Sequence, residues 1–115
     1  MTQLIDIDKF SENLSLDPEV ISELYSVFVD ESKTLLITLR DAIIIQNYDM
    51  VYESVHSLKG ICSSLMVYDA VIYEFISWQN NAKNNIAPDF DRIVNIVNSL
   101  VLDLKALFQI SNRIE

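Results

Sequence analysis

The sequence predicts an all-α protein, and three observations support that prediction. The 115 residues include one glycine and two prolines, whereas turns and β-bulges usually depend on glycine. Apolar residues recur at three-, four- and seven-residue steps, which is the period of an amphipathic helix. The breaks in this pattern are short. Long amphipathic helices with short connections favour an antiparallel four-helix bundle, here with a short additional N-terminal helix.

Composition bounds the class of protein further. Half of the residues are apolar, and the length fits one domain over residues 1–115. The single cysteine rules out an internal disulfide and suits a reducing cytoplasm. The start MTQLIDIDKF lacks a basic segment followed by an apolar one, so no signal peptide is visible. No apolar run approaches the ~20 residues of a membrane span. We therefore expect a cytoplasmic protein.

The charge of the chain is strongly acidic. There are 17 acidic and 8 basic residues, for a net charge of −9. Phosphate backbones and anionic membranes repel such a surface, so we expect neither nucleic acid nor membrane as a partner. The simplest role of the charge is solubility.

The first half of the chain contains three predicted helices. A short one is expected within residues 6–15. Asp17 and Pro18 mark the start of a long helix over about residues 19–46, since Asp caps helices and Pro suits the first turn. Asp49 is the expected cap of a third helix over about residues 50–67. The predicted buried positions are Ile21, Leu24, Phe28, Leu35, Leu39 and Ile43, followed by Val51, Val55, Leu58, Cys62 and Leu65.

The second half contains two more predicted helices. The periodicity shifts near Tyr68 and resumes in a fourth helix over about residues 70–83. After an Asn-rich loop, Pro88 and Asp89 begin the fifth. The predicted buried positions are Phe75, Ile76, Trp78 and either Val71 or Ile72, followed by Ile93, Val94, Val97, Leu100, Val101, Leu104, Leu107 and Phe108.

The only histidine and the only glycine, His56 and Gly60, lie one turn apart in the third helix. At 100° per residue, His56 points roughly 140° away from the buried seam, toward solvent. A mid-helix glycine costs about 1 kcal/mol relative to alanine. Because this position faces away from the core, helix packing does not explain it. A glycine here leaves room for a large partner to approach His56, and Lys59 adds a positive charge one turn away. Such a group suits transfer of an anionic group to nitrogen.

The motif HSLKG, in the third helix of an acidic helical chain, resembles the histidine phosphotransfer (HPt) domains of bacterial two-component phosphorelays. The motif of that family is His-x-x-Lys-Gly. The resemblance covers the whole chain in length, helix order and motif position. It implies that His56 is the phosphoacceptor and that Lys59 helps to hold the phosphoryl group. Gly60 would keep the site open for a docking receiver domain.

Some residues near the motif depart from the family pattern. Val55 stands where Ala is frequent, Ile61 where Ser or Ala is frequent, and Met66 near a position that is commonly Gly. Val55 and Met66 face inward by helical geometry, so they are expected to be packing variation. Ile61 is expected to contact the fourth helix or the partner.

The resemblance implies a phosphocarrier without catalytic activity of its own. It would take a phosphoryl group from a receiver-domain aspartate and pass it to another receiver, within a pathway that includes a hybrid sensor kinase. Glu53 stands alone near His56, so Mg²⁺ should come from the partner receiver, and no cofactor or metal of the chain's own is expected. The open phosphoacceptor face predicts a monomer. Tyr52 and Ser63 flank the site as candidate partner contacts, although ordinary exposed positions would explain them equally well.

Two other interpretations remain. The chain could be a helical docking or adaptor module that binds a receiver or kinase without phosphotransfer. It could instead be the dimerisation helix pair of a sensor kinase, but that class needs an ATP-binding domain with Gly-rich motifs, which this sequence lacks. A free-standing protein and a domain detached from a hybrid kinase both fit the sequence.

Overall fold

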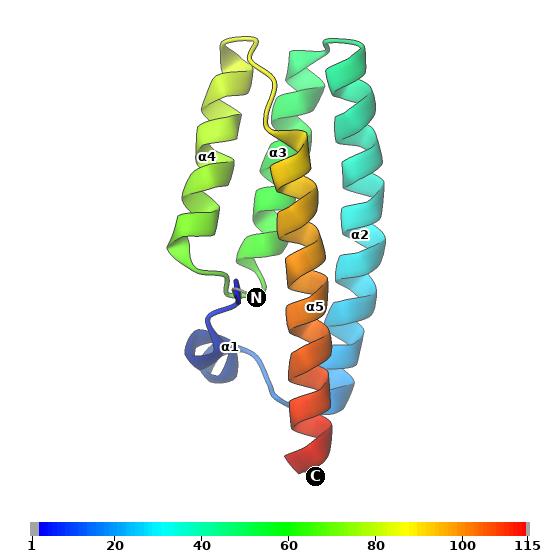
Figure 1. Ribbon diagram of the computed structural model, residues 1–115, viewed down its shortest axis with the longest axis vertical. Coiled ribbons are helices and arrows are strands. Elements are labelled where there is room, and N and C mark those ends of the chain that lie inside the picture. Colours follow the sequence, from blue (N-terminus) through cyan, green and yellow to red (C-terminus); the bar gives the residue numbers. More distant parts are fainter. Residues whose placement is uncertain (1–2, 115) are drawn as a thin grey trace.

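The computed structural model describes the backbone of residues 3–114 and the side chains of residues 3–112. Its helices are α1 (Ile7–Asn13), α2 (Pro18–Ile44), α3 (Tyr48–Ser63), α4 (Asp69–Lys83) and α5 (Phe90–Ile114). Successive long helices run in opposite directions (Figure 1). Over the described backbone the only β-type pairing is an isolated bridge between Ile5 and Val67. The all-α prediction is confirmed.

Short polar side chains cap the starts of α1, α2 and α3, whereas the start of α4 has no side-chain cap. Asp17 accepts a hydrogen bond from the Glu19 amide, and Pro18 occupies the first turn of α2, as the sequence predicts. The predicted cap of α3 is wrong. Asn47 accepts from the Met50 amide, and Asp49 lies within the first turn. At that place its negative charge faces the positive end of the helix dipole.

Three residues that follow helix ends adopt the left-handed conformation. They are Gln46, Met66 and Asn85, with φ of 59°, 59° and 60°. After α2, the Gln46 amide donates to the Ile43 carbonyl and the Asn47 amide to the Ala42 carbonyl. This is the Schellman pattern, in which glycine usually takes the left-handed position. The chain therefore ends its helices without using its one glycine.

Helix α3 is shorter than the sequence predicts. It ends at Ser63, and Leu65 and Val67 are buried in the turn that follows rather than in the helix. The inward helical position expected for Met66 is wrong, because Met66 is half-buried and lies outside the helix. Its φ of 59° is a conformation that glycine adopts without strain.

An N-terminal segment joins this turn to α5. The Asp6 amide donates to the Met66 carbonyl, and the Tyr68 amide donates to the Leu4 carbonyl. The Asp103 carboxylate in α5 accepts from the Leu4 and Ile5 amides at 2.8 and 3.2 Å. We call residues 4–6 with these partners the N-terminal clasp. It covers the turn where α3 ends and α4 begins.

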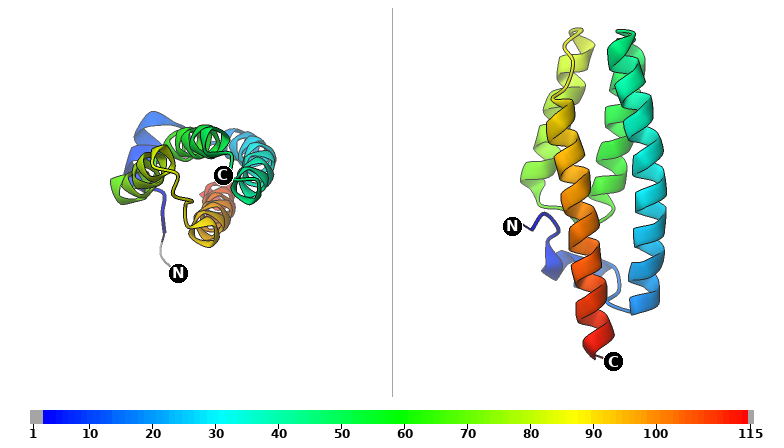
Figure 2. Two further views of the ribbon diagram at one scale, coloured as in Figure 1. Left: turned by 90° about the horizontal axis from the view of Figure 1, so that it is seen from above. Right: turned by 45° about the vertical axis from the view of Figure 1, so that its right-hand side comes forward.

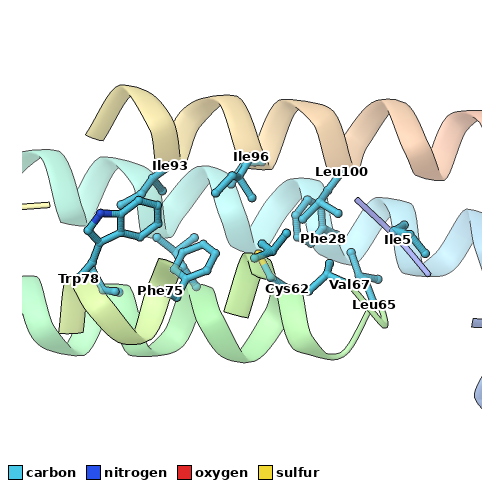
Figure 3. Close-up of a cluster of buried hydrophobic side chains, with 14 of the residues drawn as sticks. Ile5, Phe28, Cys62, Leu65, Val67, Phe75, Trp78, Ile93, Ile96 and Leu100 are labelled. Carbon is cyan, nitrogen blue, oxygen red and sulfur yellow. The ribbon is translucent and has the colours of Figure 1, made fainter. Parts of the chain in front are cut away.

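The core lies between α2, α3, α4 and α5 (Figure 3). Neighbouring backbones approach most closely in the pairs α3–α4, α2–α3 and α2–α5. Between α4 and α5, Phe75 and Trp78 of α4 reach toward Ile93 of α5 (Figure 3). An ion pair between Arg92 and Glu74 joins the same two helices at 3.0 Å. Helices α2 and α5 extend beyond α3 and α4, and α1 lies beside this extension (Figures 1 and 2).

Most of the predicted core is confirmed. The five predicted seam residues, four in α3 and Leu65 in the turn after it, are at most 1% exposed. Val71 rather than Ile72 is the buried residue in the first turn of α4. The predicted burial of Ile76 and Phe108 is wrong, since each side chain is 37% exposed. Ile96 is fully buried and was not predicted. Five other predicted core residues are half-buried: Leu24, Leu35, Ile43, Val94 and Val101.

By length and composition alone, α5 could cross a membrane over residues Phe90–Asn112. Its residues Ile93, Ile96, Leu100 and Leu104 are instead fully buried within the protein. Burial against the other helices accounts for much of the apolar character of this helix.

Candidate functional site

His56 lies on the exposed face of α3, opposite the buried seam. Its Nδ1 atom is 3.0 Å from the amide nitrogen Nε2 of Gln79 in α4. An amide nitrogen can only donate, so Nδ1 accepts this hydrogen bond. Because Gln79 occupies Nδ1, the other ring nitrogen, Nε2, is the one left to meet another molecule.

Gln79 is a buried polar residue, 5% exposed. Its Oε1 atom has no hydrogen-bond partner and is the one such buried side-chain atom in the described part of the chain. A buried polar atom without a partner is costly. Rotating the amide by 180° exchanges its oxygen and nitrogen, and would let Oε1 accept a hydrogen bond from a protonated Nδ1. Gln79 can therefore serve both tautomers of His56.

Gln79 was not predicted, although the sequence carries a signal for it. It follows Trp78 and lies four residues after Phe75, on the apolar stripe of α4. A glutamine in a buried stripe needs a polar partner. Identifying His56 as that partner required the register between α3 and α4, which the sequence does not contain.

Tyr52 and Lys83 extend the site by one turn. The Tyr52 and His56 rings are nearly parallel, at an angle of 7° with centroids 6.3 Å apart. The Lys83 ammonium lies 5.2 Å from the centroid of the Tyr52 ring. Tyr52 was predicted as a flanking residue, and Lys83 was not predicted.

Gly60 lies one turn further along α3 and is exposed. A Cβ atom added at this glycine would meet no atom within 4 Å, so close packing does not require it. The backbone does not require it either, since its φ is not positive. Nothing within the described chain explains this glycine, although a glycine inside a helix weakens it.

The remaining predicted site residues stand apart from the imidazole. Lys59 is half-buried one turn from His56, and Ser63 is exposed at the last position of α3. Among the described residues, neither forms a hydrogen bond or ion pair with His56. Ile61 is half-buried and lines a hollow of about 460 Å³ between α2 and α3, together with Leu35 and Ser57. At this hollow Ile61 faces α2, and its expected contact with the fourth helix or the partner stays a prediction.

Two other features bear on the chemistry of the site. Within residues 3–112, no group of three or more His, Cys, Asp or Glu side chains is arranged to hold a metal ion. Cys62 lies on the buried seam, and burial raises the pKa of its thiol to about 12. A thiol that remains protonated is a poor nucleophile, so Cys62 is not a candidate nucleophile at this site.

No protein-family model matches the chain, and no curated protein or solved structure shows significant similarity to it.

Proposed function

We propose that the chain is a phosphorelay intermediate that carries a phosphoryl group on Nε2 of His56. One observation supports this most directly. An exposed imidazole is held at Nδ1 by a buried glutamine and lies one turn from a glycine that the protein itself does not need. This arrangement orients a nitrogen nucleophile and leaves its approach open.

In the proposed reaction, the Nε2 lone pair attacks the phosphorus of an aspartyl phosphate on a receiver domain. The N–P bond forms as the P–O bond to the carboxylate breaks, and the carboxylate leaves with the electron pair. Nε2 needs its lone pair, so the proton of the neutral ring must sit on Nδ1. The reversed amide of Gln79 would accept that proton's hydrogen bond through Oε1 and hold the positive charge that develops on the ring. The return reaction passes the group to a second receiver.

The rest of the proposal follows the resemblance to HPt domains. Residues 1–115 form a single antiparallel four-helix bundle that works as a monomer in the cytoplasm. Its partners are receiver domains and a hybrid sensor kinase, and the receiver supplies Mg²⁺. Lys59 stabilises the charge on the phosphoryl oxygens, while Gly60, Ser63 and Tyr52 contact the receiver. The acidic surface supports the exclusion of nucleic acid.

The test is phosphoryl transfer from radiolabelled, phosphorylated receiver domains with Mg²⁺, comparing wild type with His56→Gln. We expect acid-labile, base-stable label on wild type and none on the variant. Receivers that bind the wild type without transferring label would favour a docking or adaptor module instead.

Lys59→Ala separates a chemical role from a structural one. Lys59 forms no ion pair or hydrogen bond among the described residues, so helix content should stay unchanged by circular dichroism. The transfer rate should fall by roughly tenfold or more, as expected for a lost charge-assisted hydrogen bond. Loss of the folded state would show that Lys59 is structural.

A further inference from the structure

We propose that Lys83 is a second cationic residue of this site, which leaves the Tyr52 ring and pairs with the phosphoryl group once His56 carries it. This inference rests on the proposed function and adds a residue to it. Lys83 lies on α4, outside the HSLKG motif, and only the packing of the two helices brings it to the site.

The register of α3 and α4 places Lys83 one helical turn from the contact between Gln79 and His56. The helices run antiparallel, with His56 against Gln79 and, one turn further, Tyr52 against Lys83. The centroid of the Tyr52 ring is thus 5.2 Å from the Lys83 ammonium and 6.3 Å from the centroid of the His56 ring. The lysine stem has four flexible carbons, so its ammonium can move while the helix stays fixed.

The ammonium is available for a new partner. Asp49 and Glu53 line the same hollow of about 330 Å³ as Lys83. The carboxylate oxygens of both residues are nevertheless more than 4 Å from the Lys83 ammonium. Arg40 and Arg92, by contrast, are each paired with a carboxylate. Lys83 is exposed, and an exposed ammonium is weakly held by an aromatic ring, whereas its hydrogen bond to a phosphoryl oxygen is strong. Phosphorylation should therefore draw Lys83 away from Tyr52.

Two lysines would then bracket the phosphoryl group. Lys59 lies toward the C-terminal end of α3 from His56, and Lys83 lies beside Tyr52 toward its N-terminal end. The chain has 8 basic residues against 17 acidic ones. Among the described residues neither lysine forms an ion pair, so their two positive charges would offset the acidic surface around the site. A doubly charged phosphoryl group matches two ammonium groups in charge.

The chain contains a matched control in Lys105. Its ammonium rests over the Tyr25 ring at 5.9 Å, between α5 and α2 and on elements that do not carry His56. Lys105 and Lys83 therefore share a local environment and differ in their relation to the imidazole. A general effect of phosphorylation on lysines would move both.

The direct test uses NMR of full-length protein with ¹³C-labelled lysine, before and after phosphorylation by phosphoramidate. In that reaction ammonia leaves as the Nε2–P bond forms, and no partner protein is needed. The ring current of an aromatic side chain displaces the signals of the lysine methylene beside it. We expect the Lys83 signal to return to its ordinary position on phosphorylation, while the Lys105 signal stays displaced. A Lys83 signal that does not move overturns this inference and leaves the proposed function standing. If phosphoramidate leaves wild-type His56 unmodified, the proposed function fails, and this inference fails with it.

A kinetic test distinguishes charge from structure. Lys83→Met should slow phosphorylation by phosphoramidate roughly three- to tenfold at low ionic strength, and the difference should shrink in high salt. Lys83→Arg should restore the rate, and Lys105→Met should match wild type. Equal rates for Lys83→Met and wild type at low salt would contradict the proposed role.

Discussion

In the proposed function, Gly60 serves a partner at the expense of its own helix. A side chain at this exposed position would clash with nothing in the protein. In the proposed function, the receiver domain approaches through this open space. Stability and transfer should therefore respond in opposite directions when the glycine is replaced.

We expect Gly60→Ala to raise the free energy of unfolding by about 0.5–1 kcal/mol, the usual gain for alanine over glycine inside a helix. Phosphoryl transfer from a receiver should slow, because the added methyl group occupies the approach. Urea denaturation and transfer kinetics measure the two effects. Ala106→Gly, at an exposed position in α5, is the control. It should lower stability by a similar amount and leave transfer unchanged.

Cys62 links stability to pH through its burial. Its pKa is raised from 9.0 to about 12 in the folded protein, because the buried site disfavours the thiolate. Below pH 9 the thiol is protonated in both states, and its stabilising effect is fully present. Above pH 9 the unfolded chain alone releases the proton, so stability falls as pH rises toward 12.

By pH 10 this loss should reach roughly 1 kcal/mol. Urea denaturation of wild type and Cys62→Ala between pH 8 and pH 10 isolates it, since other titrating groups are common to both. The difference in stability between them should shrink by that amount. A constant difference would show that the folded thiol also ionises.

At the scale of the helices, the three left-handed residues explain how a chain with one glycine ends its helices. Gln46 is exposed and occupies the Schellman position in the left-handed conformation. That conformation is strained for glutamine, whereas glycine adopts it without strain. Asn85 occupies the equivalent position after α4, and asparagine tolerates this conformation better than most residues.

Gln46→Gly should therefore stabilise the protein by about 1 kcal/mol in thermal or urea denaturation. Asn85→Gly should have a smaller effect, which makes it the comparison. Destabilisation by Gln46→Gly would mean that the Gln46 side chain makes a contribution that outweighs its strain.

The helices themselves could be predicted from the sequence because each carries its own period of apolar residues. The end of α3 could not, because Leu65 continues the buried seam of the helix while it packs within a turn. That turn depends on Ile5, about sixty residues away in the chain. Exposure of Ile76 and Phe108 likewise depends on which neighbours reach them, which periodicity alone does not reveal.

The candidate site likewise has a part that the sequence predicts and a part that only the packing of the helices reveals. His56, Lys59 and Gly60 belong to one helix, so their spacing could be read directly from the sequence. Gln79 and Lys83 belong to the next helix and reach the site through packing. A glutamine on an apolar stripe indicated a polar contact, but Lys83 gave no signal beyond its charge.

For the whole molecule, the N-terminal clasp connects the two ends of the fold. Asp103 is 7% exposed, and its carboxylate accepts two backbone hydrogen bonds from a segment almost a hundred residues away. One buried and one partly buried amide depend on this one side chain. The clasp also buries Ile5 completely against the lower end of the core.

We expect Asp103→Ala to lower the free energy of unfolding by about 2–3 kcal/mol, because it leaves buried donors unpaired. Hydrogen exchange should increase first at the amides of residues 4–6. Asp30→Ala, at an exposed position in α2, should change stability by less than about 0.5 kcal/mol. Unchanged protection of residues 4–6 in Asp103→Ala would show that the bridge to Val67 holds the segment alone.

The position of Trp78 gives the molecule an optical reporter of its own. This single tryptophan lies edge-on to Phe75, with ring centroids 5.2 Å apart, and directly precedes Gln79 in the chain. Any reorientation of Gln79 as His56 gains or loses a phosphoryl group would alter the surroundings of the indole. Its fluorescence should therefore follow the state of His56 in real time without an attached dye, and stopped-flow emission at a single wavelength would record each transfer as it occurs.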